Sequence, residues 1–92
     1  LVPLETVENC KEALYICKDI SELMDENMAS DVGSGALMAN AGAIAAAYNV
    51  RINLKSITNK SFSSTTLNKL EVLLKDCENT LKAILKNVEK CL

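Results

Sequence analysis

The chain has 92 residues, of which 12 are acidic and 10 basic, and its formal net charge is −2. A chain of this length forms one domain at most, or part of one, and its mixed charges give no electrostatic basis for binding nucleic acid or an anionic membrane. It contains three aromatic residues, which are few for stacking on bases, and no histidine. Histidine-based acid–base chemistry and histidine-ligated zinc are therefore excluded within these residues.

The first predicted element is an amphipathic helix over residues 4–25. Pro3 suits the first turn of a helix, and apolar residues follow at alternating spacings of three and four. The residues before Lys11 include two glutamates and no apolar run, so they do not form a secretory signal. Because the chain begins with Leu1 rather than Met, we expect it to be trimmed or excised from a longer protein.

The second predicted element is a helix over residues 30–54, capped by Ser30, with no charged side chain between Val32 and Val50. Most of its side chains are glycine or alanine, and a row of small residues spaced by four follows one side: Gly35, Ala39, Ala43 and Ala47. A helix that is apolar on nearly every side is a buried one. We therefore expect a long central helix surrounded by other helices.

The same row of small residues also fits a transmembrane helix, in which small side chains let two helices pack closely. Alanine and glycine are only weakly hydrophobic, however, and Asn40 lies in the middle of the stretch. We therefore expect no membrane span.

Residues 55–66 are rich in Ser, Thr and Asn and predict a loop, after which Ser64 or Thr65 caps a third helix over residues 65–91. Apolar residues keep a heptad spacing along that helix: Leu67, Leu70, Leu74, Cys77, Leu81, Ile84, Val88 and Cys91. This heptad stripe either packs against the first two helices or forms a coiled-coil seam with a second subunit. The predicted fold is an all-α bundle of three main helices with a long, buried, Ala/Gly-rich central helix and no strand.

The four cysteines form no CxxC pair. Cys10 and Cys17 are seven residues apart on one predicted helix, which places their Cα atoms roughly 10 Å apart, too far for a disulfide. We expect four reduced, core-facing thiols, no metal site, and a cytoplasmic location.

Two groups of polar side chains stand out against this background: Asn27, Ser30 and Asp31 at the start of the central helix, and Asn49, Arg51 and Asn53 at its end. Each has a structural explanation, because Asp31 suits the first turn, Ser30 a cap, and Arg51 the negative end of the helix dipole. The groups lie about 27–30 Å apart by helix rise. They cannot share one site within one copy unless another chain or a fold-back brings them together.

Arg51 is the only arginine of the chain, and the other nine basic residues are lysines. A guanidinium pairs with a carboxylate through two parallel hydrogen bonds, which lysine cannot reproduce. We therefore expect Arg51 to bind an anionic substrate or to form a fixed ion pair.

Two motifs at a fixed separation carry a family resemblance. An S-D-x-G-x-x-A pattern is matched by Ser30, Asp31, Gly33 and Ala36, and an N-V-R-I-N stretch is matched by residues 49–53. The run from residue 28 to 54 thereby resembles the signature of the formiminotransferase-cyclodeaminase C-terminal domain family, which includes bacterial methenyltetrahydrofolate cyclohydrolases. The proline-led helix before the motifs is similar as well. Family domains have an N-terminal half that is missing here, so residues 1–92 resemble the C-terminal half of such a domain.

The resemblance implies tetrahydrofolate one-carbon chemistry, either as a formiminotetrahydrofolate cyclodeaminase or as a methenyltetrahydrofolate cyclohydrolase. A tetrahydrofolate derivative would be the substrate, with no bound cofactor. Asp31 would be the catalytic acid or base, and Arg51 would hold the glutamate carboxylate of the folate. The remaining polar residues would contribute to substrate binding: Asn27, Ser30, Asn49 and Asn53.

An alternative function is a non-catalytic helical interaction module that retains the family scaffold, and the regular heptad stripe favours it. In either case two neighbouring helices cannot cover a helix that is apolar nearly all round. We therefore expect the chain to self-associate as a homodimer or higher homo-oligomer, packed on the 35–47 face. The family resemblance points to a dimer as well.

Overall fold

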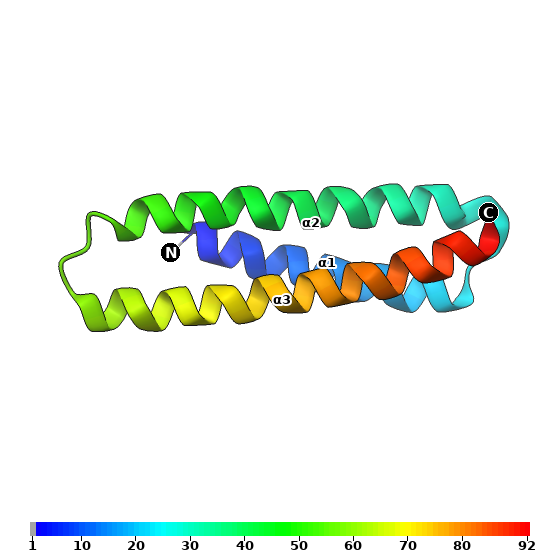
Figure 1. Cartoon of the computed structure of the whole chain (residues 1–92). Helices are drawn as coiled ribbons and strands as arrows, with labels where there is room; N and C mark the ends of the chain where they lie inside the picture. Colours follow the sequence, from blue (N-terminus) through cyan, green and yellow to red (C-terminus); the bar gives the residue numbers. More distant parts are fainter. Residues whose placement is uncertain (1) are drawn as a thin grey trace.

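The computed structural model describes residues 2–92, which fold into three long helices and, within that range, no strand. The helices are α1 (Val2–Leu23), α2 (Glu26–Leu54) and α3 (Lys60–Cys91), and each runs antiparallel to the next (Figure 1). Together they form a slender bundle with extents of 51 × 15 × 15 Å. The predicted all-α class and the three-helix bundle are confirmed.

The N-cap of α2 is Asp25, and not Ser30 as predicted. The Asp25 backbone is extended, and its carboxylate accepts a hydrogen bond from the backbone N–H of Asn27 at 3.0 Å. The helix therefore begins at Glu26, and Ser30 and Asp31 lie exposed in its second turn. Because the connection from α1 is only two residues long, α1 and α2 must be antiparallel neighbours.

The start of α3 also differs from the prediction. Asn59 caps this helix, since its side-chain oxygen accepts a hydrogen bond from the backbone N–H of Phe62 at 3.0 Å. The helix begins at Lys60, so the predicted loop shrinks to residues 55–59 and the caps expected at residues 64–65 are wrong. The shorter connection brings the first turn of α3 directly beside the last turn of α2.

The core is built from one apolar stripe of each helix, and all three pairs of helices are in contact. Leu14 of α1 and Leu70 and Ile84 of α3 are among the largest side chains that are fully buried. The predicted heptad stripe of α3 faces inward, with every member either buried or packed against the core. Of its two interpretations, packing against the first two helices is therefore confirmed.

The buried side of α2 is lined by small residues, which let the neighbouring helices come close. A Cβ atom added at Gly33 would lie 3.3 Å from Cγ1 of Val88 on α3, and one added at Gly42 would lie 3.3 Å from Sγ of Cys10 on α1. The buried residues of α2 are Ala29, Gly33, Ala36, Ala43, Ala46, Ala47, Val50 and Leu54.

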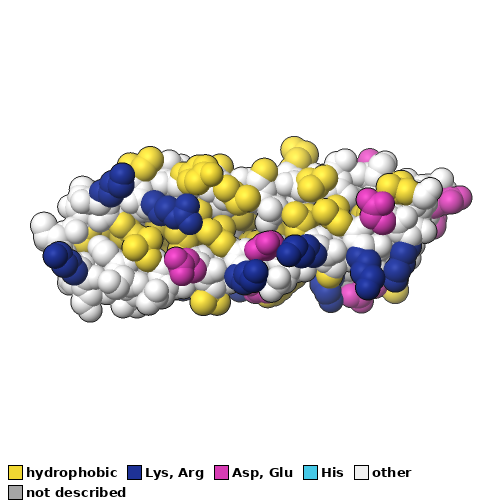
Figure 2. Space-filling view, viewed as in Figure 1, with side chains coloured by type: hydrophobic (Ala, Val, Ile, Leu, Met, Phe, Trp, Pro, Cys, Tyr) yellow, Lys and Arg dark blue, Asp and Glu magenta, His cyan; other side chains and the backbone are white. Residues whose placement is uncertain are grey.

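The opposite side of α2 is exposed in the single chain, so α1 and α3 alone do not give the expected burial on nearly every side. Its large apolar residues have exposed fractions between 42% and 74%: Leu37, Met38, Ile44, Tyr48 and Ile52. Figure 2 shows hydrophobic side chains gathered along α2 and its seam with α3. The predicted row of small residues is split between the two sides, since Ala43 and Ala47 are buried and Gly35 is exposed. A three-helix bundle covers one side of each helix and leaves the other to solvent.

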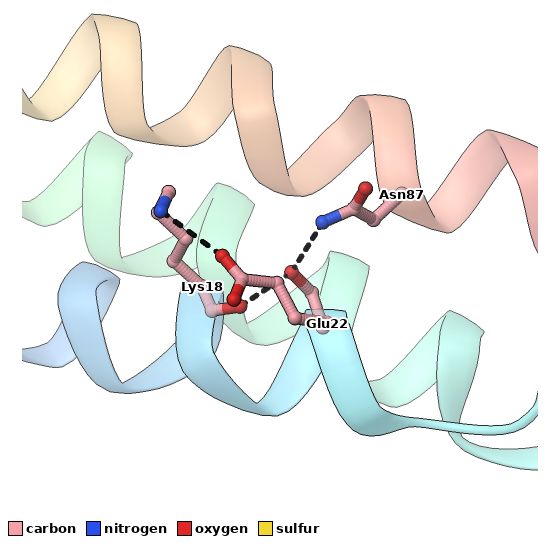
Figure 3. Close-up of polar contacts among 4 residues, drawn as sticks. Lys18, Glu22 and Asn87 are labelled. Carbon is pink, nitrogen blue, oxygen red and sulfur yellow. Dashed lines mark hydrogen bonds and ion pairs between the residues drawn. The ribbon is translucent and has the colours of Figure 1, made fainter.

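Within residues 2–92, the hydrogen bonds and ion pairs that cross between helices all link α1 to α3: Tyr15–Asp76, Ser21–Asn87 and Glu8–Lys69. Asn87 donates to the Ser21 hydroxyl at 2.9 Å, and that hydroxyl donates to the Lys18 carbonyl at 2.7 Å (Figure 3). The helix α2 is joined to its two neighbours by apolar packing.

The four cysteines are free thiols and face the core, as predicted. Cys77 is fully buried, and burial raises the pKa of its thiol above the usual range. No helix in the described part of the chain is long and apolar enough to cross a membrane.

Candidate functional site

A pocket of about 330 Å³ lies at the end of the bundle where the chain passes from α2 into α3, at the left of Figure 1. Its lining comes from the last turn of α2, the connection and the first two turns of α3: Arg51, Leu54, Lys55, Ser63 and Leu67. The apolar part of the lining comes from Leu54, which is buried in the core, and from Leu67, which packs against the core. The volume lies near the lower limit for small-molecule sites, which is about 300 Å³.

Two basic residues flank this pocket. Within residues 2–92, no carboxylate lies within salt-bridge distance of Arg51 or Lys55. The Arg51 guanidinium lies over the ring of Tyr48 instead, 5.9 Å from its centroid, in a cation–π contact. The expected fixed ion pair of Arg51 is therefore wrong for the described chain. Both cations remain available to an anion that enters the pocket.

Ser63 adds a polar group to the pocket. Its hydroxyl oxygen is shielded from solvent and has no hydrogen-bond partner among the described residues. A buried hydroxyl without a partner costs about 1–3 kcal/mol, so most such groups in folded proteins are satisfied. The backbone N–H of Ser63 is engaged, because it donates to the Asn59 carbonyl at 3.1 Å.

The structure does not bring the predicted site residues together. All six are exposed on α2, and Asp31 and Arg51 are separated by 20 residues of continuous helix, or about 30 Å. Only Arg51 lines the pocket. The backbone N–H of Asn27 donates a hydrogen bond to the Asp25 cap at the start of α2, and the Asn53 carbonyl accepts a hydrogen bond from the Ser56 hydroxyl at 2.9 Å. The backbone groups of these two residues therefore also form hydrogen bonds at the ends of α2.

Lys55 and Ser63 line the pocket but were not predicted, because residues 55–66 were expected to form a loop. The sequence does carry a signal for Ser63. Asn59 is a strong N-cap residue, and neither glycine nor proline follows it before the heptad stripe begins. Extending the stripe back from Leu67 by one turn places Ser63 on the same face.

Residues 1–72 match the family model described as formiminotransferase-cyclodeaminase. The chain belongs to this family. It is also 36% identical, over 73 residues, to a methenyltetrahydrofolate cyclohydrolase of Methylorubrum extorquens, and the match covers 79% of this chain and 35% of that protein. The chain therefore spans about a third of the length of the curated relative it matches. No solved structure matches the chain.

The part of the chain that matches the family contains the whole candidate site. Residues 1–72 include α1, α2 and the first turns of α3, and therefore every predicted site residue and every residue that lines the pocket. The resemblance seen in the two motifs is thus confirmed over a much longer stretch of chain. The last turns of α3 lie outside the match.

Proposed function

We propose that the protein to which this chain belongs hydrolyses 5,10-methenyltetrahydrofolate to 10-formyltetrahydrofolate. The observation that carries this proposal is the 36% identity to a methenyltetrahydrofolate cyclohydrolase over 73 residues. The pocket beside Arg51 supports it, because a folate ends in carboxylates that a guanidinium can bind. Since the chain spans only 35% of that relative, the proposal concerns the whole protein, and this chain supplies part of its site.

In the proposed reaction, the oxygen of water bonds to the methenyl carbon that bridges N5 and N10 of the folate. The bond from that carbon to N5 then breaks, which leaves a formyl group on N10. One proton of the water moves to N5 and the other is released. A positioned carboxylate can accept and return these protons, and we assign this role to Asp31, which is exposed in the second turn of α2. Hydrolysis transfers no electrons, so the proposal needs no bound cofactor.

The remaining predicted residues would hold the substrate. We assign the folate glutamate to Arg51, whose guanidinium can pair with a carboxylate through two hydrogen bonds. Amide and hydroxyl groups can donate to and accept from the polar groups of a folate, and four exposed residues of α2 offer them: Asn27, Ser30, Asn49 and Asn53.

A second copy of the chain would bring the two ends of α2 into one region, and we propose a homodimer or higher homo-oligomer. The expected 35–47 face must be corrected, because Ala43 is buried in the bundle, but the exposed Leu37 and Ile44 offer an apolar surface beside it. Asp31 and Arg51 are each ten positions from Ala41. An antiparallel pair of α2 helices centred there would therefore place Asp31 of one copy level with Arg51 of the other. We further propose a cytoplasmic location, which suits four free thiols.

The experiment is a spectroscopic assay that follows loss of the methenyl chromophore with the intact protein. We expect Asp31→Asn to lower kcat by about 10²–10⁴, the usual contribution of an acid–base group. Asp19→Asn, which changes an exposed acid of α1, is the matched control and should leave the rate unchanged. Unaltered turnover in Asp31→Asn would remove that residue from the mechanism.

A second assay separates the remaining functions. Ammonia release from formiminotetrahydrofolate, without loss of the methenyl compound, would identify the protein as a cyclodeaminase. A folded protein with neither activity would favour the non-catalytic interaction module.

A further inference from the structure

The charges of the chain are distributed unevenly along its length. Every aspartate and glutamate lies outside residues 32–70, whereas four basic residues lie inside that range: Arg51, Lys55, Lys60 and Lys69. Lys69 is paired with Glu8 of α1, but the other three form no ion pair within residues 2–92. Figure 2 shows basic side chains at the turn between α2 and α3. That end of an otherwise acidic chain is therefore cationic, which favours an anionic ligand.

The pocket at this end joins three kinds of group within about 330 Å³. Two cations stand at its edge, on the last turn of α2 and in the connection. Leu54 and Leu67 form an apolar surface between the helices. The Ser63 hydroxyl has no hydrogen-bond partner within residues 2–92, and rotation about its single side-chain torsion can turn it toward a ligand without any movement of α3.

This combination selects a ligand with three matching parts. An anionic carboxylate suits the cations, a flat or apolar group suits the leucines, and a carbonyl oxygen between them suits the serine O–H. A small inorganic anion would satisfy the cations but would leave the apolar surface unused. The ligand class is therefore an acylated amino acid with an aromatic acyl group.

We propose that the pocket between α2 and α3 binds the benzoyl-glutamate tail of the substrate, an assignment whose ligand rests on the proposed function. Arg51 and Lys55 hold the glutamate carboxylates, and Leu54 and Leu67 contact the benzoyl ring. Ser63 donates a hydrogen bond to the benzoyl carbonyl. Lys55 and Ser63 thereby become binding residues for the tail, and the one-carbon group reacts elsewhere.

The test measures binding of N-(4-aminobenzoyl)-L-glutamate to the protein by isothermal titration calorimetry. Arg51→Gln should weaken binding by about tenfold or more, because it removes charge-assisted hydrogen bonds, and Lys55→Gln should weaken it by a smaller factor. Lys90→Gln is the matched control at the opposite end of the bundle and should bind normally. Amidation of both carboxylates of the probe should abolish binding to the wild type.

Ser63→Ala separates a binding role from a structural one. We expect weaker binding of the probe together with a raised Tm, because the variant removes a buried hydroxyl that the free protein leaves unpaired. A raised Tm with unchanged affinity would overturn the role of the hydroxyl. The whole assignment would be overturned if the wild type failed to bind the probe. It would also be overturned if Arg51→Gln and Lys55→Gln both bound the probe as tightly as the wild type does.

The probe has no one-carbon group, so these measurements are independent of turnover. Binding by a protein without cyclohydrolase activity would leave the tail pocket standing while the proposed function fails. If Arg51→Gln and Lys55→Gln instead hydrolyse the methenyl compound with an unchanged KM, the proposed function stands and the pocket assignment is wrong.

Discussion

The two sides of α2 reverse the usual relation between side-chain size and burial. The side that faces the bundle is lined mainly by alanine and glycine, whereas the side that faces solvent carries the larger Leu37, Ile44 and Tyr48. Large apolar residues are more often the ones buried. In this bundle, close approach of α1 and α3 to α2 requires small residues at the contact, as the tight spaces around Gly33 and Gly42 show. Size therefore decides which side packs inward.

The first prediction breaks this arrangement from the inside. Ala43 is fully buried, so Ala43→Leu inserts three extra carbon atoms into a packed contact between helices. We expect a loss of about 1–3 kcal/mol in the free energy of unfolding, which is typical of overpacked cores. Urea denaturation of the two proteins measures it. Ala41→Leu adds the same group on the exposed side of α2 and should change stability little. Equal stability of both variants would contradict the inner role of small residues.

The sequence predicts that α2 is a helix, but it does not predict which side of this helix faces the bundle. A long run without charges or proline identifies the helix, but small residues occur on all of its sides, including the exposed Gly35 and Ala41. Nothing in that pattern tells the inner side from the outer one. In α3 the apolar residues occupy one stripe and charges occupy the rest, so its packing could be predicted correctly.

The candidate site divides in the same way. Arg51 could be found from sequence, because it is the single arginine and lies within a family motif. Lys55 and Ser63 depend on how the turn between α2 and α3 closes, and that turn is set by one capping hydrogen bond of Asn59. Lys55 lies in the connection and has no periodic signature, and the Ser- and Thr-rich composition of residues 55–66 favours a loop over the first turn of α3.

The second prediction tests the outer side of α2. Ile44 is 42% exposed in the single chain, and in the proposed homodimer it lies near the centre of the interface. Ile44→Lys places a charge in that apolar contact and should weaken association by about tenfold or more, while the unfolding of the single chain changes little. Light scattering over a dilution series measures the association.

The matched control for this variant is Val72→Lys, which places the same charge on an exposed apolar position of α3. It should associate as the wild type does. A wild-type chain that stays monomeric at high concentration, or an Ile44→Lys variant that still associates normally, would show that the outer side of α2 is not the interface between copies.

The third prediction has the smallest expected effect. It concerns the polar contacts between α1 and α3, which have no counterpart at α2 within residues 2–92. Tyr15 of α1 donates a hydrogen bond to the Asp76 carboxylate of α3, and this bond raises the pKa of the tyrosine above its usual value of 10.0, with smaller contributions from desolvation and nearby negative charge. A pKa raised by folding contributes stability below the unfolded value, and that contribution is lost as pH rises through the folded value. The α1–α3 contact should therefore weaken above about pH 10.

Thermal unfolding of the wild type and Tyr15→Phe between pH 7 and pH 11 measures this loss. We expect the Tm of the wild type to fall more steeply above pH 10, because the variant has no phenol to ionise at the contact. The effect is small, since Tyr15 lies at the surface. Cys77 also titrates at alkaline pH, but it is present in both proteins and cancels in the difference. Tyr48→Phe, on the outer side of α2, should keep the wild-type slope. If Tyr15→Phe also keeps the wild-type slope, the hydrogen bond from Tyr15 to Asp76 does not contribute measurably to the stability of the bundle.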